Sequence, residues 1–313
     1  MSHGIGLDVG GTKIAGGVVS RDGTVVDLRQ VPTPDTAEGL EEAIVELASD
    51  LAAEHEVSTV GVGVAGHVAR DRAHVLYAAN LPWPAAVPLR ETLQSRLRLP
   101  VVVENDGNAA TWAEHRFGAG MDVKHLLLLT VGTGVGGGVV LDGRLHRGAF
   151  GVAGEVGHLR LVPDGLPCGC GARGCLELYA SGSALVRQTQ QAAALDRAGS
   201  AALVASAGSL DRITGPVITE LARAGDEFAI ARLAEVGRHL GEGLASLTAI
   251  LDPAVVLVGG GVSAAGELLL APLRAAFCEH QPGRGLLPEP QIRPAKLGPV
   301  AGVVGAADLA RCP

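Results

Sequence analysis

The chain opens with short runs of β-branched and other apolar residues that are interrupted by glycine-containing turns. The runs cover Gly4–Val9, Lys13–Ser20 and Val25–Val31, and the turns fall at Gly10-Gly11 and Asp22-Gly23. Runs of this length separated by such turns are typical of β-strands joined by tight hairpins. The pattern predicts a three-stranded antiparallel meander, which is unlike the start of a dinucleotide-binding fold.

Helical and strand patterns alternate after the meander. Helical spacing is present over Thr36–Glu54, Leu89–Leu97 and Asp106–Phe117, with strands expected at Val57–Val64 and Val101–Val103. The other expected elements are strands at His125–Val131, Gly138–Leu141 and Val255–Val258, and helices at Glu227–Leu251, after Gly261 and at Gly302–Leu309. A second strand-turn-strand pattern thus begins at His125, so the second half is predicted to repeat the plan of the first.

Length and composition favour two lobes over one small module. The chain has 313 residues, of which 47% are apolar and 19% charged. We expect an N-terminal lobe of residues 1–118, joined by a C-terminal helix over residues 300–313, and a larger lobe of residues 119–299. The net charge is −8 and the sequence has no Lys/Arg run, so phosphate backbones are not attracted and nucleic acid is not an expected partner.

Targeting and membrane signals are missing from the sequence. Met1–Val9 lacks a basic region followed by an apolar run, and glycines or Asp252-Pro253 interrupt the longest apolar stretches. We therefore expect a cytoplasmic protein with no membrane partner. Three of the five cysteines crowd into eight residues, at Cys168, Cys170 and Cys175. In a reducing compartment this clustering favours a metal site over disulfides.

The glycine turn between the first two expected strands carries residues suited to a nucleotide. Gly10 and Gly11 let backbone N–H groups approach a phosphate. Thr12 and Lys13 can add a hydroxyl and a positive charge, and Asp8 can hold a hydrated magnesium ion. A plain hairpin turn explains the same glycines, and the order of a P-loop is missing. The turn is a candidate ATP and magnesium site that depends on support from other motifs.

Two further glycine clusters are candidates for contacts with ATP. Gly132–Gly138 satisfies the spacing of a dinucleotide fingerprint, but a strand follows it where that fingerprint requires a helix. We expect instead a second strand-turn-strand loop, which carries Thr133 and Gly134. The cluster that contains Gly260 and Gly261 closes a strand and opens a helix, a suitable seat for an adenosine. A helix start chosen for its flexibility explains that cluster nearly as well.

An acidic and amide-rich segment, Glu104–Ala110, joins an expected strand to an expected helix. A carboxylate at such a junction, beside a magnesium nucleotide, can accept the proton of an attacking hydroxyl. Capping of the helix by Asn105 or Asp106 explains the same residues without catalysis. The segment alone leaves both interpretations open.

One histidine and three cysteines follow the glycine-rich segment Gly148–Gly157. A closed tetrahedral zinc site can form from His158, Cys168, Cys170 and Cys175, and the intervening glycines allow the chain to fold around an ion. A redox pair or chance is the alternative. Because one residue separates Cys168 from Cys170, the thioredoxin spacing is absent, and zinc is favoured.

Together these motifs resemble the ROK family of repressors, open reading frames and kinases, and within it the bacterial glucokinases. The resemblance covers almost the whole chain, and its most specific parts are Gly151–His158 and Cys168–Glu177, which occur together with Asn105-Asp106. It implies an α/β, actin-like (ribonuclease H-like) two-lobed ATPase fold with a cleft between the lobes. One departure is Ala65-Gly66-His67, where the family usually has Pro-Gly-Pro, which leaves the shape of that loop open.

The resemblance also implies roles for individual residues. Asp106 would be the catalytic base, and a structural zinc would lie in residues 155–177 on His158 and the three cysteines. Carboxylates accept hydrogen bonds from adjacent hydroxyls, as a sugar ring requires. The implied sugar ligands are Asn105, Asp106, Glu155, His158 and Glu177, and Asn80 in Asn80-Leu81-Pro82-Trp83 is a further candidate.

The activity implied by the resemblance is phosphorylation of a free hexose at its 6-hydroxyl by magnesium-ATP. D-Glucose is the expected substrate, with N-acetylglucosamine, N-acetylmannosamine or mannose as alternatives. A sugar-responsive regulator is the other class in the family, and such relatives carry a helix-turn-helix before the first phosphate loop. Only seven residues precede Asp8, and Asp8, Thr12 and Asp106 are all present, so a kinase is expected over a regulator or a non-catalytic scaffold. The resemblance implies a homodimer or homotetramer.

Overall fold

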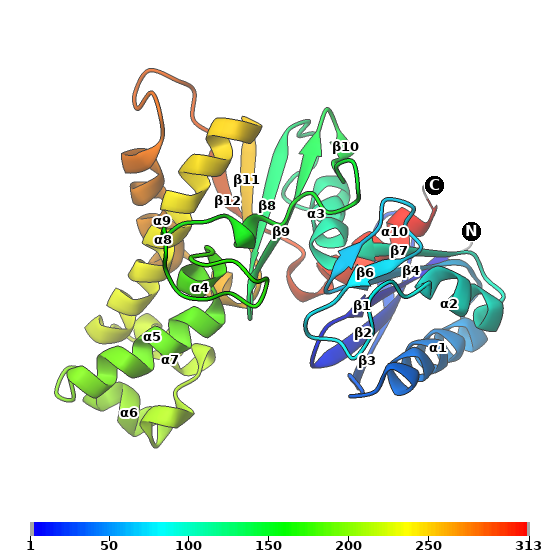
Figure 1. The fold of residues 1–313 in the computed structure, drawn as a ribbon, viewed down its shortest axis with the longest axis horizontal. Helices are drawn as coiled ribbons and strands as arrows, with labels where there is room; N and C mark the ends of the chain where they lie inside the picture. Colours follow the sequence, from blue (N-terminus) through cyan, green and yellow to red (C-terminus); the bar gives the residue numbers. More distant parts are fainter. Residues whose placement is uncertain (1–2, 312–313) are drawn as a thin grey trace. The chain divides into compact units, whose positions relative to one another are not determined.

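A computed structural model describes residues 3–311 of the chain. The chain separates into two compact units: Met1–Leu128, Gly137–Gly154 and Ala295–Pro313 form the first, and Leu129–Gly136 and Glu155–Pro294 form the second (Figure 1). The expected boundary between the lobes, after residue 118, lies inside the first unit. The two-lobe division at residue 118 stays a prediction. Cys312 and Pro313, the last two residues of the expected C-terminal helix, lie outside the described residues.

The first unit contains a five-stranded sheet of order β3-β2-β1-β4-β7. Its members are β1 (His3–Val9), β2 (Lys13–Val19), β3 (Val25–Pro32), β4 (Val57–Val64) and β7 (Val101–Asn105). The first three strands pair antiparallel, which confirms the predicted meander, whereas β1, β4 and β7 run parallel. The carboxyl ends of three strands therefore meet at one edge of this sheet.

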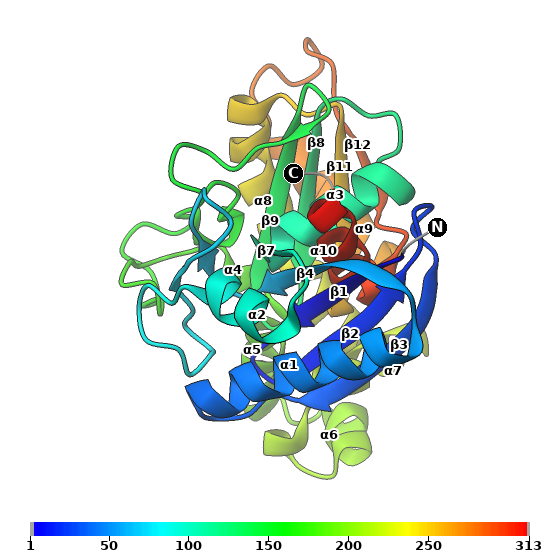
Figure 2. The same cartoon turned by 90° about the vertical axis from the view of Figure 1, so that its right-hand side faces the viewer.

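Helices cover both faces of the first sheet, as Figures 1 and 2 show for α1 (Ala37–Glu54) and α10 (Ala301–Arg311). A Cβ added at Gly16 would meet the side chain of Leu47 in α1. A Cβ added at Gly6 would instead lie 1.9 Å from the carbonyl oxygen of Val303 in α10. Glycine at position 6 thus lets α10 pack directly against the strands. The other helices of this unit are α2 (Leu89–Leu97) and α3 (Asp106–Phe117).

The core of the first unit is aliphatic, as the composition indicated. Its fully buried members come from the strands, from α1 and from α2, and include Ile5, Leu7, Ile14, Ile44, Val62, Leu93 and Val103. A two-stranded sheet that sequence reasoning missed, β5 (His67–Val68) with β6 (Val75–Tyr77), lies in the connection after β4. Burial of this apolar surface supplies the main favourable term for folding of the unit.

A second five-stranded sheet has the order β10-β9-β8-β11-β12. Its strands are β8 (Leu126–Val131), β9 (Val135–Leu141), β10 (Arg144–Leu145), β11 (Val255–Gly259) and β12 (Gln291–Pro294). β9 begins at Val135, earlier than the predicted start at Gly138. β12 pairs parallel with β11 and ends on a proline, and it was not predicted.

The second unit contains β11, β12 and parts of β8 and β9, and helices make up most of the rest of it. They are η1 (Val156–His158), α4 (Glu177–Ala180), α5 (Gly182–Leu195), α6 (Ala201–Ala207), η2 (Leu210–Arg212), α7 (Gly215–Arg223), α8 (Glu227–Leu251), η3 (Gly261–Ala265) and α9 (Glu267–His280). The α8 bounds match the prediction. The helix expected after Gly261 is the short 3-10 turn η3, and α9 starts only at Glu267. A further 3-10 turn, η4 (Gly298–Val300), precedes α10 in the first unit. Among the described residues, no helix combines the length and apolar character needed to cross a membrane.

Candidate functional site

The parallel strand ends of the first unit bring together the acidic and amide residues that the sequence singled out. Asp8 pairs in register with Gly63 of β4, and Gly63 pairs with Glu104 of β7. Asn105 ends β7 and Asp106 begins α3 directly after it. Ligands of open α/β sheets bind beyond such carboxyl ends, so this edge is a candidate site.

The first glycine turn lies between β1 and β2, as predicted. The Gly10 N–H donates to the carbonyl oxygen of Lys13 at 3.1 Å, and the Thr33 hydroxyl donates to the Gly10 carbonyl at 2.6 Å. A Cβ added at Gly11 would lie 3.0 Å from the backbone oxygen of Asn80, so the loop that carries Asn80 rests against this turn. Thr12 and Lys13 are exposed. The turn therefore offers its hydroxyl and ammonium groups to a ligand.

Asp8 lies under this turn. Burial raises the pKa of its carboxyl group above the ordinary value, and the positive charge of Lys13 opposes that shift in part. A Cβ added at Gly302 of α10 would lie 2.6 Å from an Asp8 oxygen, so only glycine leaves room there. A divalent cation beside Asp8 would favour the ionised carboxylate that burial disfavours.

Asn105 and Asp106 have separate tasks at the start of α3. Asn105 caps the helix, because its Oδ1 accepts a hydrogen bond from the Asn108 N–H at 2.9 Å. Its Nδ2 donates to the Asp106 Oδ1 and to the Gly66 carbonyl, each at 3.1 Å. The capping interpretation therefore holds for Asn105. The Asp106 carboxylate is not needed as the cap. Its Oδ1 also accepts the Gly107 N–H at 2.9 Å, so this N–H and the Asn105 amide together orient it.

The hydrogen bond to Gly66 also shows how the unusual Ala65-Gly66-His67 segment is shaped. The Gly66 carbonyl accepts a hydrogen bond from Asn105. A Cβ at position 66 would lie 2.7 Å from the backbone carbonyl oxygen of Tyr77 in β6. The segment thus supports the end of β7 although the Pro-Gly-Pro sequence is absent.

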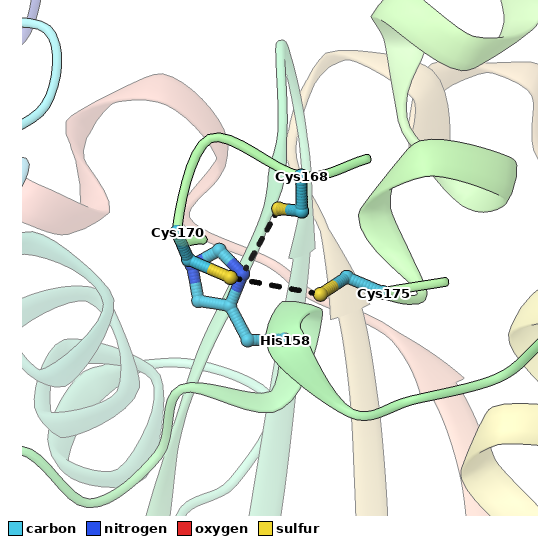
Figure 3. Close-up of side chains that lie close together, drawn as sticks. All are labelled: His158, Cys168, Cys170 and Cys175. Carbon is cyan, nitrogen blue, oxygen red and sulfur yellow. Dashed lines mark hydrogen bonds between the residues drawn. The ribbon is translucent and has the colours of Figure 1, made fainter. Parts of the chain in front are cut away.

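The second unit brings the predicted zinc ligands together (Figure 3). One donor atom from each of His158, Cys168, Cys170 and Cys175 lies within 4.8 Å of the other three. The Cys168 sulfur is 3.7 Å from His158 Nδ1, and the Cys170 and Cys175 sulfurs are also 3.7 Å apart. Zinc with bonds of about 2.3 Å to sulfur requires ligand separations of roughly 3.5 to 3.8 Å at the corners of a tetrahedron. Both 3.7 Å separations agree with that geometry.

The pKa values of the three thiols in this cluster are shifted in different directions, by burial and by backbone hydrogen bonds. Burial raises the pKa of Cys168 to about 12 and also raises the pKa of Cys175. A hydrogen bond from the Ala172 N–H lowers the pKa of Cys170, the exposed member. Metal ligation requires thiolates, so a bound metal must displace protons from the two buried thiols. The cluster is suited to a soft divalent ion that binds thiolate strongly.

The acidic residues near the cluster face the same histidine. Glu155 Oε2 lies 4.0 Å from His158 Nε2, the ring nitrogen on the other side from Cys168. Glu177 Oε1 accepts a hydrogen bond from the Cys168 thiol at 3.1 Å and lies 3.5 Å from His158 Nδ1. A Cβ added at Gly134 would meet Glu177 Oε2 at 2.8 Å. Glu155, His158 and Glu177 thus form one polar group, which the glycine at position 134 leaves room for.

A large cavity of about 1120 Å³ opens beside the second glycine loop, within the second unit. Gly132 and Thr133 line it together with the starts of α5 and η3 and one face of α7. Gly261 also lines the cavity, while Gly260 turns the chain into η3 with φ 85° against the Val131 carbonyl. Its volume suits a nucleoside-sized ligand.

Sequence reasoning missed the remaining walls of this cavity. They include Ser183, Arg187, Gln190, Thr219 and Arg223. The one local signal was the Ser181 cap, whose Oγ accepts the Ala184 N–H at 3.1 Å and so marks a helix start beside the loop. Sequence reasoning also missed two arginines, Arg72 and Arg147, on the buried Glu104 carboxylate.

Comparisons with known proteins agree with the family resemblance of the sequence motifs. The model of the ROK family matches residues 4–312. A glucokinase from Streptomyces coelicolor is 46% identical over 99% of this chain and 98% of its own length. The crystal structure of a ROK family glucokinase from Streptomyces griseus in complex with glucose and AMPPNP has 48% identity and a TM-score of 0.93, and the match covers 99% of each chain. The solved structures of this family confirm the predicted actin-like kinase fold.

A more distant relative differs in its substrate. An N-acetylmannosamine kinase from Yersinia pestis is 34% identical over 85% of this chain and 85% of its own length. The Streptomyces coelicolor glucokinase is therefore more similar to this chain, and over a larger share of it, than this N-acetylmannosamine kinase.

Proposed function

This chain belongs to the ROK family, and on that premise we propose that it is an ATP-dependent glucokinase, which phosphorylates D-glucose at the 6-hydroxyl. The observation that carries the proposal is the near full-length likeness to glucokinases, one of them in complex with glucose and an ATP analogue. The arrangement of Asp106 and of the Glu155, His158 and Glu177 group supports it, because carboxylates and imidazole suit a ring of hydroxyls.

For the chemical step we propose Asp106 as the general base. Its carboxylate accepts the proton of the 6-hydroxyl while that oxygen attacks the γ-phosphorus, and the bond to the β,γ-bridging oxygen breaks to release ADP. Asn105 holds the carboxylate through the 3.1 Å hydrogen bond from its Nδ2. The further sugar ligands we propose are Asn105, Glu155, His158 and Glu177, with Asn80 near the first glycine turn.

For the nucleotide we propose two kinds of contact. Phosphates are bound by the first turn, through Gly10, Gly11, Thr12 and Lys13, and by Thr133 and Gly134 of the second loop. The cavity beside that loop takes the adenosine, with Gly260 and Gly261 at one wall. Asp8 holds the magnesium ion, which supplies positive charge to the phosphoryl oxygens when it is bound.

For the cysteine cluster we propose a structural zinc held by His158, Cys168, Cys170 and Cys175. Four protein ligands leave no open position, so the ion would contribute stability to the segment and no activated water. With Nδ1 turned toward Cys168, His158 keeps Nε2 on the Glu155 side, where it can donate to a sugar hydroxyl.

A second candidate function differs from the first in the hexose that is phosphorylated. The likeness to N-acetylmannosamine kinases favours an N-acetylated sugar as the alternative acceptor. A coupled assay of ADP release with glucose, mannose, N-acetylglucosamine and N-acetylmannosamine decides between them. We expect the highest kcat/KM for glucose. A higher value for an N-acetylated sugar would overturn the glucokinase assignment, and no turnover with any hexose would favour a regulator.

Assembly and location complete the proposal. We propose a homodimer or homotetramer in the cytoplasm, as the family resemblance implies. Sedimentation equilibrium of the purified chain, with a monomer of 31.7 kDa as reference, distinguishes these states.

A further inference from the structure

Glu104 is a buried carboxylate that has no role in the proposed chemistry and is not needed to form its strand. It belongs to β7 and its residue is only 2% exposed. Arg147 Nε donates to its Oε2 at 2.7 Å, and Arg72 Nε lies 3.5 Å from the same oxygen. Its Oε1 accepts from the Asn108 Nδ2 at 3.1 Å. A buried charge is tolerated only with such partners, so the whole set depends on each member.

A chain of hydrogen bonds runs from this carboxylate to Asp106. The Asn105 N–H donates to Glu104 Oε1 at 3.2 Å, and the Asn105 Nδ2 donates to Asp106 Oδ1 at 3.1 Å. Asn108, which donates to Glu104, also gives its backbone N–H to the Asn105 cap. Glu104 therefore fixes the amide that orients the proposed base, from two directions.

Arg147 begins a loop that continues to the other set of proposed sugar ligands. Within it Gly148, Gly151 and Gly154 have φ of 71°, 95° and 94°, and the next residue is Glu155. Arg147 accepts the Ala153 N–H on its own carbonyl at 3.2 Å, which closes the loop on itself. Glycine adopts positive φ without steric cost, so the ion pair to Glu104 anchors the start of a loop whose course depends on these three glycines.

The neighbouring segment holds the same loop from the side. Arg70 donates from Nη1 to the Gly148 carbonyl at 2.6 Å, and its N–H donates to the Phe150 carbonyl at 3.1 Å. Arg72, two residues on, gives Nη2 to the Leu309 carbonyl of α10 at 2.9 Å. Arg72 thus connects Glu104 to the helix that packs on the sheet.

We propose that the Glu104–Arg147 ion pair is a positioning element of the kinase, which sets the Asp106 carboxylate and the start of the Gly148–Gly154 loop in fixed relation. Glu104 and Arg147 touch neither substrate nor reacting atoms. They act through Asn105 on one side and through the loop that leads to Glu155 on the other. This inference rests on the proposed kinase function and deepens it.

The test is a double-mutant cycle of Glu104→Gln and Arg147→Met, with kcat and KM measured for the hexose that the wild-type chain uses best. Glu104→Gln removes the carboxylate that Arg147 and Arg72 share, and Arg147→Met leaves the buried Glu104 with Arg72 as its one remaining arginine among the described residues. We expect each to lower kcat by about 10- to 100-fold and to raise the KM of the hexose, because displacement of a catalytic group by about 1 Å has effects of this size. The KM of ATP should stay within about twofold. The double variant should lose less than the product of the two single losses, because each single variant already breaks the Glu104–Arg147 contact.

The matched control is Glu42→Gln, which breaks an exposed ion pair of 2.6 Å with Arg96 in the same unit. It should leave all kinetic constants unchanged. Thermal unfolding of every variant is measured in parallel, and kinetics are recorded well below the lowest midpoint. Where Glu104→Gln does not fold, Arg147→Lys replaces it, because lysine keeps the charge but loses the Nε contact.

Two results would overturn the inference. Variants with lowered melting temperature but wild-type kcat and hexose KM would show that the pair only stabilises the fold. Losses that multiply in the double variant would show that the two residues act independently. A wild-type chain without activity on any hexose would instead overturn the proposed function, and this inference with it.

Discussion

The strand edge that carries Asp106 and the cysteine cluster that contains His158 are built in different ways. At the strand edge, β-ladder register and a helix cap place Asp8, Asn105 and Asp106. In the cluster, the segment after η1 has little regular structure: only isolated antiparallel bridges, Arg160–Cys175 and Pro167–Arg173, join its arms, and its four donor atoms lie within 4.8 Å of one another. The first region is preorganised by hydrogen bonds that form on folding. The second has only short stretches of backbone pairing, and its four side chains converge where a metal ion could join them.

This difference separates chemistry from recognition. Replacing Asp106 at the strand edge should change mainly the rate of phosphoryl transfer. Perturbing the cluster should change sugar affinity and leave the nucleotide-binding groups intact. The substitutions below test that separation.

The largest effect is expected for Asp106→Asn. Loss of the general base should lower kcat by at least about 100-fold, with glucose affinity within a modest factor of the wild type. Steady-state kinetics and calorimetric titration of glucose provide the two numbers. The matched control is Asp226→Asn, which changes a helix-capping aspartate of α8 in the same way. If both variants kept wild-type turnover, Asp106 would have no role beyond the start of its helix.

Removal of a zinc ligand should have the next largest effect. Cys168→Ala or Cys175→Ala should abolish zinc binding and weaken glucose binding by about 10- to 100-fold, because the ion orients His158 and fixes the segment between Glu155 and Glu177. Elemental analysis should give about one zinc per wild-type chain. ATP-analogue binding should persist.

Cys278→Ala is the control for the cluster, since Cys278 lies in α9 and outside the four ligands. It should retain zinc and glucose affinity. Unchanged glucose affinity in a metal-free wild-type preparation would contradict the role assigned to zinc.

A smaller effect is expected for Asp8→Ala. Without the buried carboxylate, kcat/KM for magnesium-ATP should fall by about tenfold, less than the full contribution of a metal ion, because Thr12, Lys13 and backbone amides remain. Glucose binding, measured by calorimetry, should be unaffected. The exposed Asp50 of α1 offers a control in Asp50→Ala. An equal loss of both ligands would mean that the first unit had misfolded.

The smallest effect should come from Tyr179→Phe, which removes a support of the cluster. The Tyr179 hydroxyl accepts the Leu166 N–H at 2.9 Å, just ahead of Cys168. Loss of one such hydrogen bond is worth about 1 kcal/mol, so the melting temperature should fall slightly and zinc should dissociate faster under a chelator. Tyr77→Phe, on an exposed ring, is the control. Equal zinc dissociation rates in the two variants would show that the Tyr179 hydroxyl does not support the cluster.

Elements defined by local sequence signals could be predicted, whereas elements defined by distant contacts could not. The bounds of α2, α3 and α8 follow from apolar spacing and, for α3 and α8, from the capping residues Asn105 and Asp226 directly before each helix. β12 could not be found in this way, because Pro294 is unusual in a strand and only pairing with β11 defines it.

The candidate site shows the same limit. The cluster ligands are close in sequence and could be recognised from their spacing, and their donor atoms lie together in the structure. The cavity walls at Arg187 and Arg223 come from separate helices, and the partners of Glu104 lie 32 and 43 residues away in the chain, so only tertiary structure reveals them.

The central claim is that the chain transfers the γ-phosphoryl group of ATP to the 6-hydroxyl of glucose. Phosphorus NMR of a reaction with the zinc-loaded chain, magnesium-ATP and glucose tests it most directly. The account predicts one glucose 6-phosphate formed for each ADP released, and a signal from this ester that is missing when Asp106→Asn is incubated for the same time. ADP and free phosphate without an ester, or an ester at another hydroxyl, would contradict it.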